Sequence, residues 1–357
     1  MPETVQAKIQ SSCFRNIYWF SRYLLNTDQY GALGKIKEPE FLNLVVILET
    51  LLAQKNFSAE DKLKLFKKTL SNEVKKFCKI GTKNYNLSLN LIAKLDEEIQ
   101  NVEDAFVFCM AMKYFVAPIN QAMKFVPADD KIFCEIAAKN ILDTFGEEKI
   151  ATLIETWDNL GIKGCLDVER SLVVEEFEKL IDNLSRLNIF HSKFDDSIML
   201  TAFVQEFERR LGQKRKSRGG TSLESVTDFI FEYYKIKSTE KPSHFDQDIE
   251  VDKWFKCKDG WIVGISCKRT LRERWKQLSQ ADRGTLSHFK IRELWHLITF
   301  DKDLSDDKIV RLGEQGQIFY LPESGETYKK CSEHLGMKNY VRPLKNFVSD
   351  IRKLTSK

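Results

Sequence analysis

The chain lacks several features that would assign it at once to a functional class. Its eight cysteines are scattered and form no CxxC pair, which argues against a disulfide framework or a zinc site built from paired thiolates. None of its five histidines lies in a nucleophile motif. The sequence also has no P-loop and no dinucleotide-binding glycine pattern. A Ser-His-Asp or Cys-His hydrolase is therefore disfavoured, and neither ATP nor NAD is indicated.

Signals for export or membrane insertion are absent from the sequence as well. The first residues, Met1-Pro-Glu-Thr-Val-Gln6, lack the apolar run of a signal peptide. No segment approaches the ~18 uninterrupted apolar residues of a membrane helix. We therefore expect a soluble, cytoplasmic protein with reduced thiols and no membrane partner.

A strong excess of one charge is also lacking. The 357 residues include 56 basic and 52 acidic side chains, a net charge of +4. Any polyanionic partner must then be bound by a local basic patch rather than by the protein's overall field. The hydrophobic fraction of 43% is enough for a core, and the length allows two domains.

Proline and strand-type alternation are scarce in the first part of the chain, which favours helices. Leu63, Phe66 and Leu70 recur at helical spacing. A further amphipathic helix over residues 199–211 leads into a basic run that ends in Gly219-Gly220, for which we predict a flexible cationic loop. We expect an all-α domain over residues 1–198, which serves as an oligomerisation scaffold or binds DNA or an effector, and a second domain over residues 199–357.

The second part alternates helices and strands. Thr221-Ser-Leu-Glu224 has the spacing of a capping box and predicts the start of a helix. Apolar, β-branched runs predict strands over residues 249–255, 261–268, 294–300 and 317–321, with helices between the later strands and a helical tail over residues 341–354. The order predicts an α/β core with a mixed central sheet flanked by helices.

The first two predicted strands carry the candidate chemistry. The two-residue period of a strand places Glu250 and Asp252 on one face. Asp259-Gly260 predicts a hairpin turn, after which Lys268 ends the return strand. The hairpin would bring Asp252 near Lys268. Carboxylates of this kind suit Mg²⁺, and an adjacent lysine can orient a water and neutralise a phosphate; an exposed strand face is the alternative interpretation.

A basic helix is predicted directly after Lys268. Leu271, Trp275 and Leu278 recur at helical spacing, so Arg272, Glu273 and Arg274 would project from its first turns. Arginine can pair with guanine and glutamate with cytosine in the major groove. A charged, solvated helix surface is the alternative. Basic side chains expected to contact DNA in addition are Arg269, Lys276, Arg215 and Arg218.

The segment resembles type II restriction endonucleases of the EcoRII, SsoII and PspGI group, within the PD-(D/E)xK nuclease superfamily. The similarity is carried by Ser266-Cys-Lys268, by Thr270-Leu-Arg-Glu-Arg-Trp275 and by the Arg/Gly-rich lead into Ser222-Leu-Glu224. It covers roughly residues 200–300. The resemblance implies an α/β restriction-endonuclease-like core and a Mg²⁺-dependent homodimer, or a higher homo-oligomer, that cuts double-stranded DNA at a CC/GG-containing site. It also implies a cognate DNA methyltransferase.

The resemblance also implies roles for individual residues. Lys268 matches the catalytic lysine, and Arg272, Glu273 and Arg274 match the base-reading trio. Glu224 matches an acid near the metal site. The first catalytic aspartate is Asp252 by hairpin geometry, with Asp246 and Asp248 as rivals.

The second acid of the family is missing from its usual place, where this chain has Gln280 and Ala281. Asp282 is one substitute, and Glu224 with Glu250 is another. Two other functions are therefore retained: a structure-selective repair-type nuclease with the same core, and a DNA-binding protein that does not cleave.

Overall fold

The structure is a computed structural model. It describes residues 4–31, 33–76, 79–187, 192–245, 250–271, 275–279 and 282–355. For Trp275 and Gln277 it describes the backbone only. The chain folds into two compact units. Unit 1 comprises residues 1–127 and 167–214, and unit 2 comprises residues 128–166 and 215–357. None of the helices in the described ranges combines the length and apolarity needed to cross a bilayer.

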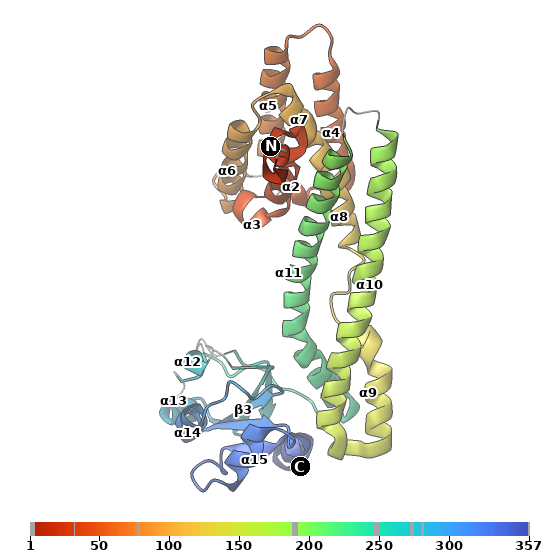
Figure 1. Cartoon of the computed structure of the whole chain (residues 1–357). Coiled ribbons are helices and arrows are strands. Elements are labelled where there is room, and N and C mark those ends of the chain that lie inside the picture. The colour runs from red at the N-terminus through yellow and green to blue at the C-terminus, as the bar shows by residue number, and fades with distance from the viewer. Residues whose placement is uncertain are drawn as a thin grey trace. The chain divides into compact units, whose positions relative to one another are not determined.

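The regular elements of unit 1 are all helices among its described residues (Figure 1). Its core is built from aromatic and aliphatic side chains, among them Phe20, Phe66 and Phe108, whose rings meet edge to face. This confirms the expectation of a mostly helical N-terminal region. The elements wholly within it are α1 (Val5–Ser11), η1 (Cys13–Asn16), α2 (Ile17–Leu25), α3 (Thr27–Tyr30), η2 (Leu33–Lys35), α4 (Glu38–Ala53), α5 (Ala59–Lys76), α6 (Lys83–Glu98), α7 (Val102–Met110), the π-helical turn η3 (Ala111–Val116) and α8 (Ala117–Ala122).

Two long helices contribute residues to both units: α10 (Ile150–Arg186) and α11 (Lys193–Tyr233). The compact units therefore do not coincide with the expected boundary between residues 198 and 199. Unit 2 additionally contains α9 (Lys131–Phe145), η4 (Gly146–Lys149) and the first part of α10. Apolar side chains of these elements, including Leu142, Leu153 and Trp157, share one core cluster with Val226 and Ile230 of α11.

The remainder of unit 2 is a five-stranded mixed sheet with helices between the strands. Strand β1 is antiparallel to β2, whereas β2, β3, β4 and β5 run parallel in that order. The elements are β1 (Lys253–Lys256), β2 (Ile262–Lys268), α12 (Trp275–Leu278), α13 (Arg283–His288), β3 (Ile291–Ile298), α14 (Asp306–Glu314), β4 (Gln317–Leu321), α15 (Glu326–Glu333), β5 (Val341–Pro343), η6 (Leu344–Asn346) and α16 (Phe347–Thr355).

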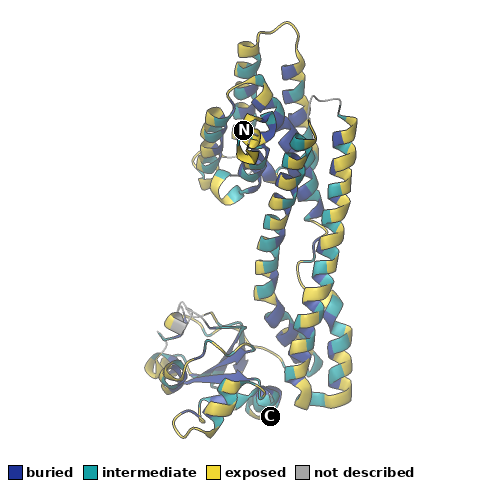
Figure 2. Cartoon of the chain, in the orientation of Figure 1, coloured by how far each residue is buried: buried dark blue, intermediate teal, exposed yellow. Residues whose placement is uncertain are grey.

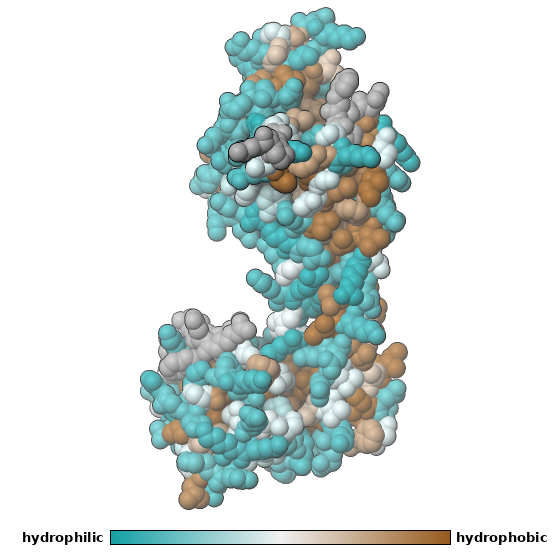
Figure 3. Space-filling view, viewed as in Figure 1, coloured by the Kyte–Doolittle hydropathy of each residue, from teal (hydrophilic) through white to brown (hydrophobic). Residues whose placement is uncertain are grey.

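Both faces of the sheet are covered, so its strands are buried on both sides (Figure 2). Val263, Ile265 and Cys267 pack into the cluster that contains α9, α10, α11 and α16. The neighbouring positions face the other cluster, which includes side chains of α13 and α14. A mixed α/β core flanked by helices is thus confirmed at this coarse level. On the face of the molecule in Figure 3, hydrophilic side chains cover most of the surface.

Two predicted strands are shifted: β1 covers Lys253–Lys256, without residues 250–252, and β3 covers Ile291–Ile298 rather than residues 294–300. Three further local predictions, about α11 and the tail, are wrong. The basic run over residues 213–220 is helical and belongs to α11, because lysine, arginine and glutamine are good helix formers and buried Leu211 and Leu223 hold the helix on both sides. Thr221-Ser-Leu-Glu224 consequently begins no helix and lies within α11. The tail begins with strand β5 rather than with a helix, since residues 341–343 pair with β4.

Candidate active site

The hairpin of β1 and β2 forms as the sequence predicts. Cys257 N donates to Trp261 O at 2.7 Å, and Gly260 adopts φ +85°, a conformation that favours glycine. Lys253 pairs with Ile265, and the backbone N–H of Asp252 donates to Ile265 O at 2.9 Å. This pairing continues the ladder beyond β1 and holds Asp252 beside the end of β2.

Lys268 lies between two carboxylates. Its Nζ is 3.4 Å from Asp252 Oδ1 and 3.2 Å from Glu250 Oε2. The side chains of Lys268 and Asp252 are only 12% and 13% exposed, whereas Glu250 is 65% exposed. The predicted proximity of Asp252 and Lys268 is therefore confirmed. Asp252 is oriented further by the N–H of Cys267, which donates to its Oδ2 at 2.6 Å.

Glu224 supplies a third acid from a different element. It lies on α11 and lines the same cavity as Lys268 and Glu250. Burial raises the pKa of Glu224, and the negative charge of Asp252 raises it further, while Lys268 acts in the opposite direction. Two carboxylates thus contact the ammonium of Lys268, and a third, from a different part of the sequence, lies on the same cavity. A bound cation would relieve the repulsion between these carboxylates.

The cavity has a volume of about 420 Å³ and lies between α11 and the chain that follows β2. Lys268, Arg269 and Thr270 line it from the end of β2 and the residues that follow, and Glu224 lines it from α11. Cys267 also touches it, but burial raises the pKa of its thiol to about 12, so this group is protonated at neutral pH. The cation that contacts the acids Asp252 and Glu250 is the ammonium of Lys268.

The donor atoms suit a hard cation, although the described residues hold no ready-made cage. In those residues no group of three or more His, Cys, Asp or Glu side chains is placed to bind a metal ion. Mg²⁺, however, usually keeps several waters and takes one or two carboxylates together with substrate phosphates. Asp252 and Glu250 would provide two such carboxylates, so the site fits Mg²⁺ by its chemistry.

A buried polar network lies beside the lysine and was not predicted. Arg269 Nη2 donates to Asp158 Oδ1 of α10 at 2.6 Å. Ser222 of α11 donates to Asp130 and, at 3.4 Å, to Asp158, while Trp157 Nε1 donates to Asp130 Oδ1 at 2.8 Å. Burial raises the pKa of Asp158, and Arg269 offsets part of that rise. No sequence signal near Lys268 identifies partners more than a hundred residues upstream.

The residues expected to contact DNA fall into three groups. Arg272, Glu273 and Arg274 lie outside the described residues, as do Asp246, Asp248, Gln280 and Ala281. Lys276 is exposed on α12. Arg269 is paired with Asp158. Arg218 is buried, at 7% exposure, and Arg215 is half-buried. These three arginines are therefore less accessible to DNA than fully exposed side chains would be.

Of the two substitutes for the missing acid, only one lies with Lys268. Asp282 caps α13, where its Oδ1 accepts from Thr285 N at 2.7 Å; this backbone bond lowers the pKa of its carboxyl group. Glu224 and Glu250 line the cavity of Lys268 instead. The geometry therefore favours these two glutamates as the companions of Asp252.

A buried histidine connects the sheet to α12. His296 of β3 is fully buried, and its Nε2 lies 2.8 Å from Gln317 Oε1. Gln317 Nε2 in turn donates to Leu278 O at 2.8 Å. Burial lowers the pKa of His296 to about 4, so the ring is neutral near pH 7. This chain of bonds fixes the end of α12.

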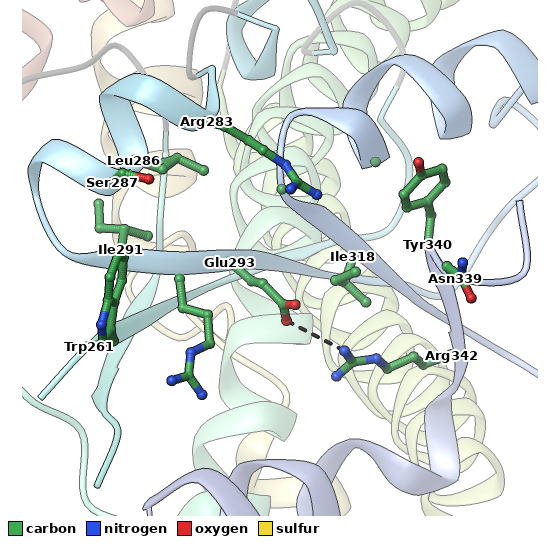
Figure 4. A pocket seen from close by; sticks show the side chains of 13 residues that line it. Trp261, Arg283, Leu286, Ser287, Ile291, Glu293, Ile318, Asn339, Tyr340 and Arg342 are labelled. Carbon is green, nitrogen blue, oxygen red and sulfur yellow. Dashed lines mark hydrogen bonds and ion pairs between the residues drawn. The ribbon is translucent and has the colours of Figure 1, made fainter. Parts of the chain in front are cut away.

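A larger cavity of about 660 Å³ lies at the other end of the parallel strands, near the start of β3 and β4 (Figure 4). It contains guanidinium groups, but two of them already have acidic partners. Arg342 pairs with Glu293 at 3.5 Å and Arg292 pairs with Asp259. No acid cluster like that around Lys268 lines this cavity, and among the described residues the Lys268 cluster is the better candidate for chemistry.

Comparisons of the chain with protein-family models, with curated proteins and with solved structures gave no match. Any function must therefore be argued from the residues themselves.

Proposed function

We propose that unit 2 is a Mg²⁺-dependent endonuclease that hydrolyses phosphodiester bonds of double-stranded DNA at a CC/GG-containing site. The observation that carries this proposal is the joint position of Lys268, Asp252 and Glu250 at the end of the hairpin, with Glu224 on the same cavity. The resemblance over roughly residues 200–300 is a second support, because it depends on the order of residues rather than on their positions in space.

The acids and the lysine of the site would have different roles in hydrolysis. Asp252 and Glu250 would hold Mg²⁺ together with water molecules, and Glu224 on the same cavity would add its negative charge nearby. The ion, when bound, would acidify water and stabilise negative charge on a phosphate. Lys268 would orient the attacking water and offset the charge that develops on the phosphate oxygens. The tight bond from Cys267 N to Asp252 keeps that carboxylate in place, so little reorganisation is needed when substrate arrives.

Specificity would come from Arg272, Glu273 and Arg274, whose side chains can read C·G pairs in the major groove. The resemblance further suggests a homodimer or higher homo-oligomer, which would present two such sites to the two DNA strands, and a cognate methyltransferase that protects the host. We place this activity in the cytoplasm, where incoming DNA would be met.

A second candidate, binding of DNA without cleavage, is favoured by one specific observation. Ser266 stands where the commoner motif has an acid, it is 2% exposed, and the described residues contain no three-residue metal group. If Glu224 and Glu250 do not compensate, DNA binding would remain without hydrolysis.

Digestion of unmethylated phage DNA distinguishes these functions. The purified protein is incubated with the DNA in Mg²⁺ and, in parallel, in EDTA. Discrete fragments in Mg²⁺ alone support the site-specific endonuclease, and their ends give the recognition sequence. A continuous smear contradicts the sequence specificity. Intact DNA that is nevertheless retarded in a gel shift supports the binding protein instead.

A further inference from the structure

Two adjacent glycines occupy the interior of α11, a helix of 41 residues. Glycine is one of the least favourable residues at such a position, because it loses the most backbone freedom on folding. Gly219 and Gly220 also lack the positive φ angle for which glycine is often required. Their presence in a continuous helix therefore needs another reason.

Packing against the rest of the protein does not supply that reason. A Cβ atom added at Gly219 or Gly220 meets nothing within 4 Å. Two glycines of α10 behave differently, since a Cβ at Gly161 lies 2.5 Å from Asp130 Cβ and one at Gly164 lies 2.6 Å from the ring of Phe133. Gly161 and Gly164 make room for α9, whereas Gly219 and Gly220 leave open space.

That open space belongs to the cavity of Lys268. Ser217, Gly220, Thr221 and Glu224 follow one another at i, i+3, i+4 and i+7, so they lie along one face of α11, and all four line the cavity together with Gly219. We call Ser217, Gly219, Gly220 and Thr221 the glycine face. It extends about 10 Å along the helix from Glu224, and Ser217, Gly220 and Thr221 are exposed.

Basic side chains near the glycine face suit an anionic chain, and the acids of the same cavity, Glu224 and Glu250, are those assigned above to the Mg²⁺ site. Lys268 and Arg269 line the same cavity as the glycine face. Lys216 precedes Gly219 and Gly220 by three and four residues, is exposed, and makes no ion pair with any residue that the structure describes. A polyanion that runs from Lys268 along α11 would therefore meet a cation at each end of a surface free of bulky side chains.

We propose that the glycine face is the surface against which the DNA strand lies next to the bond to be cut. Its deoxyribose and phosphate groups approach the backbone of α11 closely, because no Cβ stands at Gly219 or Gly220. This inference rests on the proposed endonuclease function and adds to it the path of the strand. The two glycines weaken the helix and leave the substrate room.

Substitution at Gly220 tests the inference, with Gly212 of the same helix as a matched control. A Cβ at Gly212 also meets nothing within 4 Å, and Gly212 does not line the cavity. Gly220→Ala and Gly212→Ala should each raise Tm by about 1–4 °C, because alanine is the better helix former. Gly220→Ala should nevertheless lower kcat/KM for cleavage about tenfold and Gly220→Leu about a hundredfold, while Gly212→Ala stays within about twofold of the wild type.

The outcomes are distinct from those of the proposed function itself. If the wild type cuts DNA and Gly220→Leu cuts equally well, the inference is wrong. Equal losses for Gly220→Ala and Gly220→Leu would indicate a hinge rather than a surface, and would also overturn it. If the wild type does not cut, the endonuclease proposal fails, and DNA binding by Gly220→Leu is then compared with that by a matched Gly212→Leu variant in a gel shift. Weaker binding by Gly220→Leu supports the path of the strand, and equal binding rejects it.

Discussion

At the scale of single residues, the site depends on groups that are far apart in sequence and few in number. The pair of Asp252 and Lys268 could be predicted, because a hairpin with an Asp-Gly turn leaves little choice about which residues face each other. The pair of Asp158 and Arg269 could not be predicted, because 111 residues separate the two and neither lies in a sequence motif that indicates its partner. Tertiary partners of this kind become visible only in the folded chain.

Arg269→Ala distinguishes two roles for this arginine: pairing with Asp158 within the fold, and binding of DNA. Because Asp158 would lose its guanidinium partner in a largely buried setting, the substitution should lower the free energy of unfolding by about 1–2 kcal/mol. Urea denaturation measures this loss. Lys276→Ala, at an exposed lysine on α12, serves as the control and should change it by less than about 0.5 kcal/mol. A stable Arg269→Ala variant with weakened DNA binding would assign Arg269 to DNA instead.

His296 should make unfolding depend on pH. Its pKa is about 4 in the folded protein, with burial as the main cause, against an ordinary value near 6.5. Below pH 6.5 the unfolded chain binds the proton more readily, so stability falls as the pH drops from about 6.5 towards 4. We expect this residue to contribute a loss of about 2–3 kcal/mol between pH 7.5 and 4.5.

Denaturant titrations at the two pH values check this expectation. In His296→Gln the contribution should vanish, so the variant should lose less stability than the wild type on acidification. An identical loss in both proteins would show that other groups dominate the acid response.

At the scale of elements, the sequence predicts the hairpin and strand β4 closely, and the other elements less closely. Strand β4 has the predicted bounds, residues 317–321, because an apolar run between a glycine and a proline is unambiguous. The capping-box pattern at Thr221 was misleading, because it can also occur inside a helix that tertiary packing continues. The short strand β5 was missed, since three residues carry too little periodicity to distinguish them from the helix that follows.

An alanine in place of a glycine should lower the stability of the protein in α10, where the helix packs closely against α9, and raise it in the middle of α11. Gly161→Ala would place a methyl group 2.5 Å from the Cβ of Asp130, which bonds Trp157 and Ser222. We expect this variant to lose about 1–3 kcal/mol of stability despite its better helix propensity. Thermal denaturation beside Gly212→Ala, which should gain about 1 kcal/mol, provides the comparison. A stabilised Gly161→Ala variant would refute the close approach of the two helices.

At the scale of the whole molecule, unit 2 is assembled from two separate stretches of the chain. Residues 128–166 supply apolar side chains, among them Leu142, Leu153 and Trp157, to the same core as α11 and the sheet. A prediction of domains from composition alone places one boundary and cannot foresee such a discontinuous unit. The mixed α/β class, by contrast, follows from the alternation of strands and helices in sequence.

Truncation tests this assembly. A protein of residues 199–357 lacks α9 and the first part of α10, so it would expose Val226 and Ile230 to water. We expect it to unfold without a cooperative transition, whereas residues 128–357 should unfold cooperatively. Circular dichroism during urea titration makes the measurement. Equal cooperativity in both proteins would show that residues 128–166 are dispensable to unit 2.

The measurement that bears most directly on the central claim is DNA cleavage by Lys268→Ala, beside Lys329→Ala as a control at an exposed lysine of α15. If Lys268 and its acids hydrolyse DNA, the wild type and Lys329→Ala will cut duplex DNA in Mg²⁺ and not in EDTA. Lys268→Ala will then bind DNA without cutting it. Undiminished cleavage by Lys268→Ala would contradict the account.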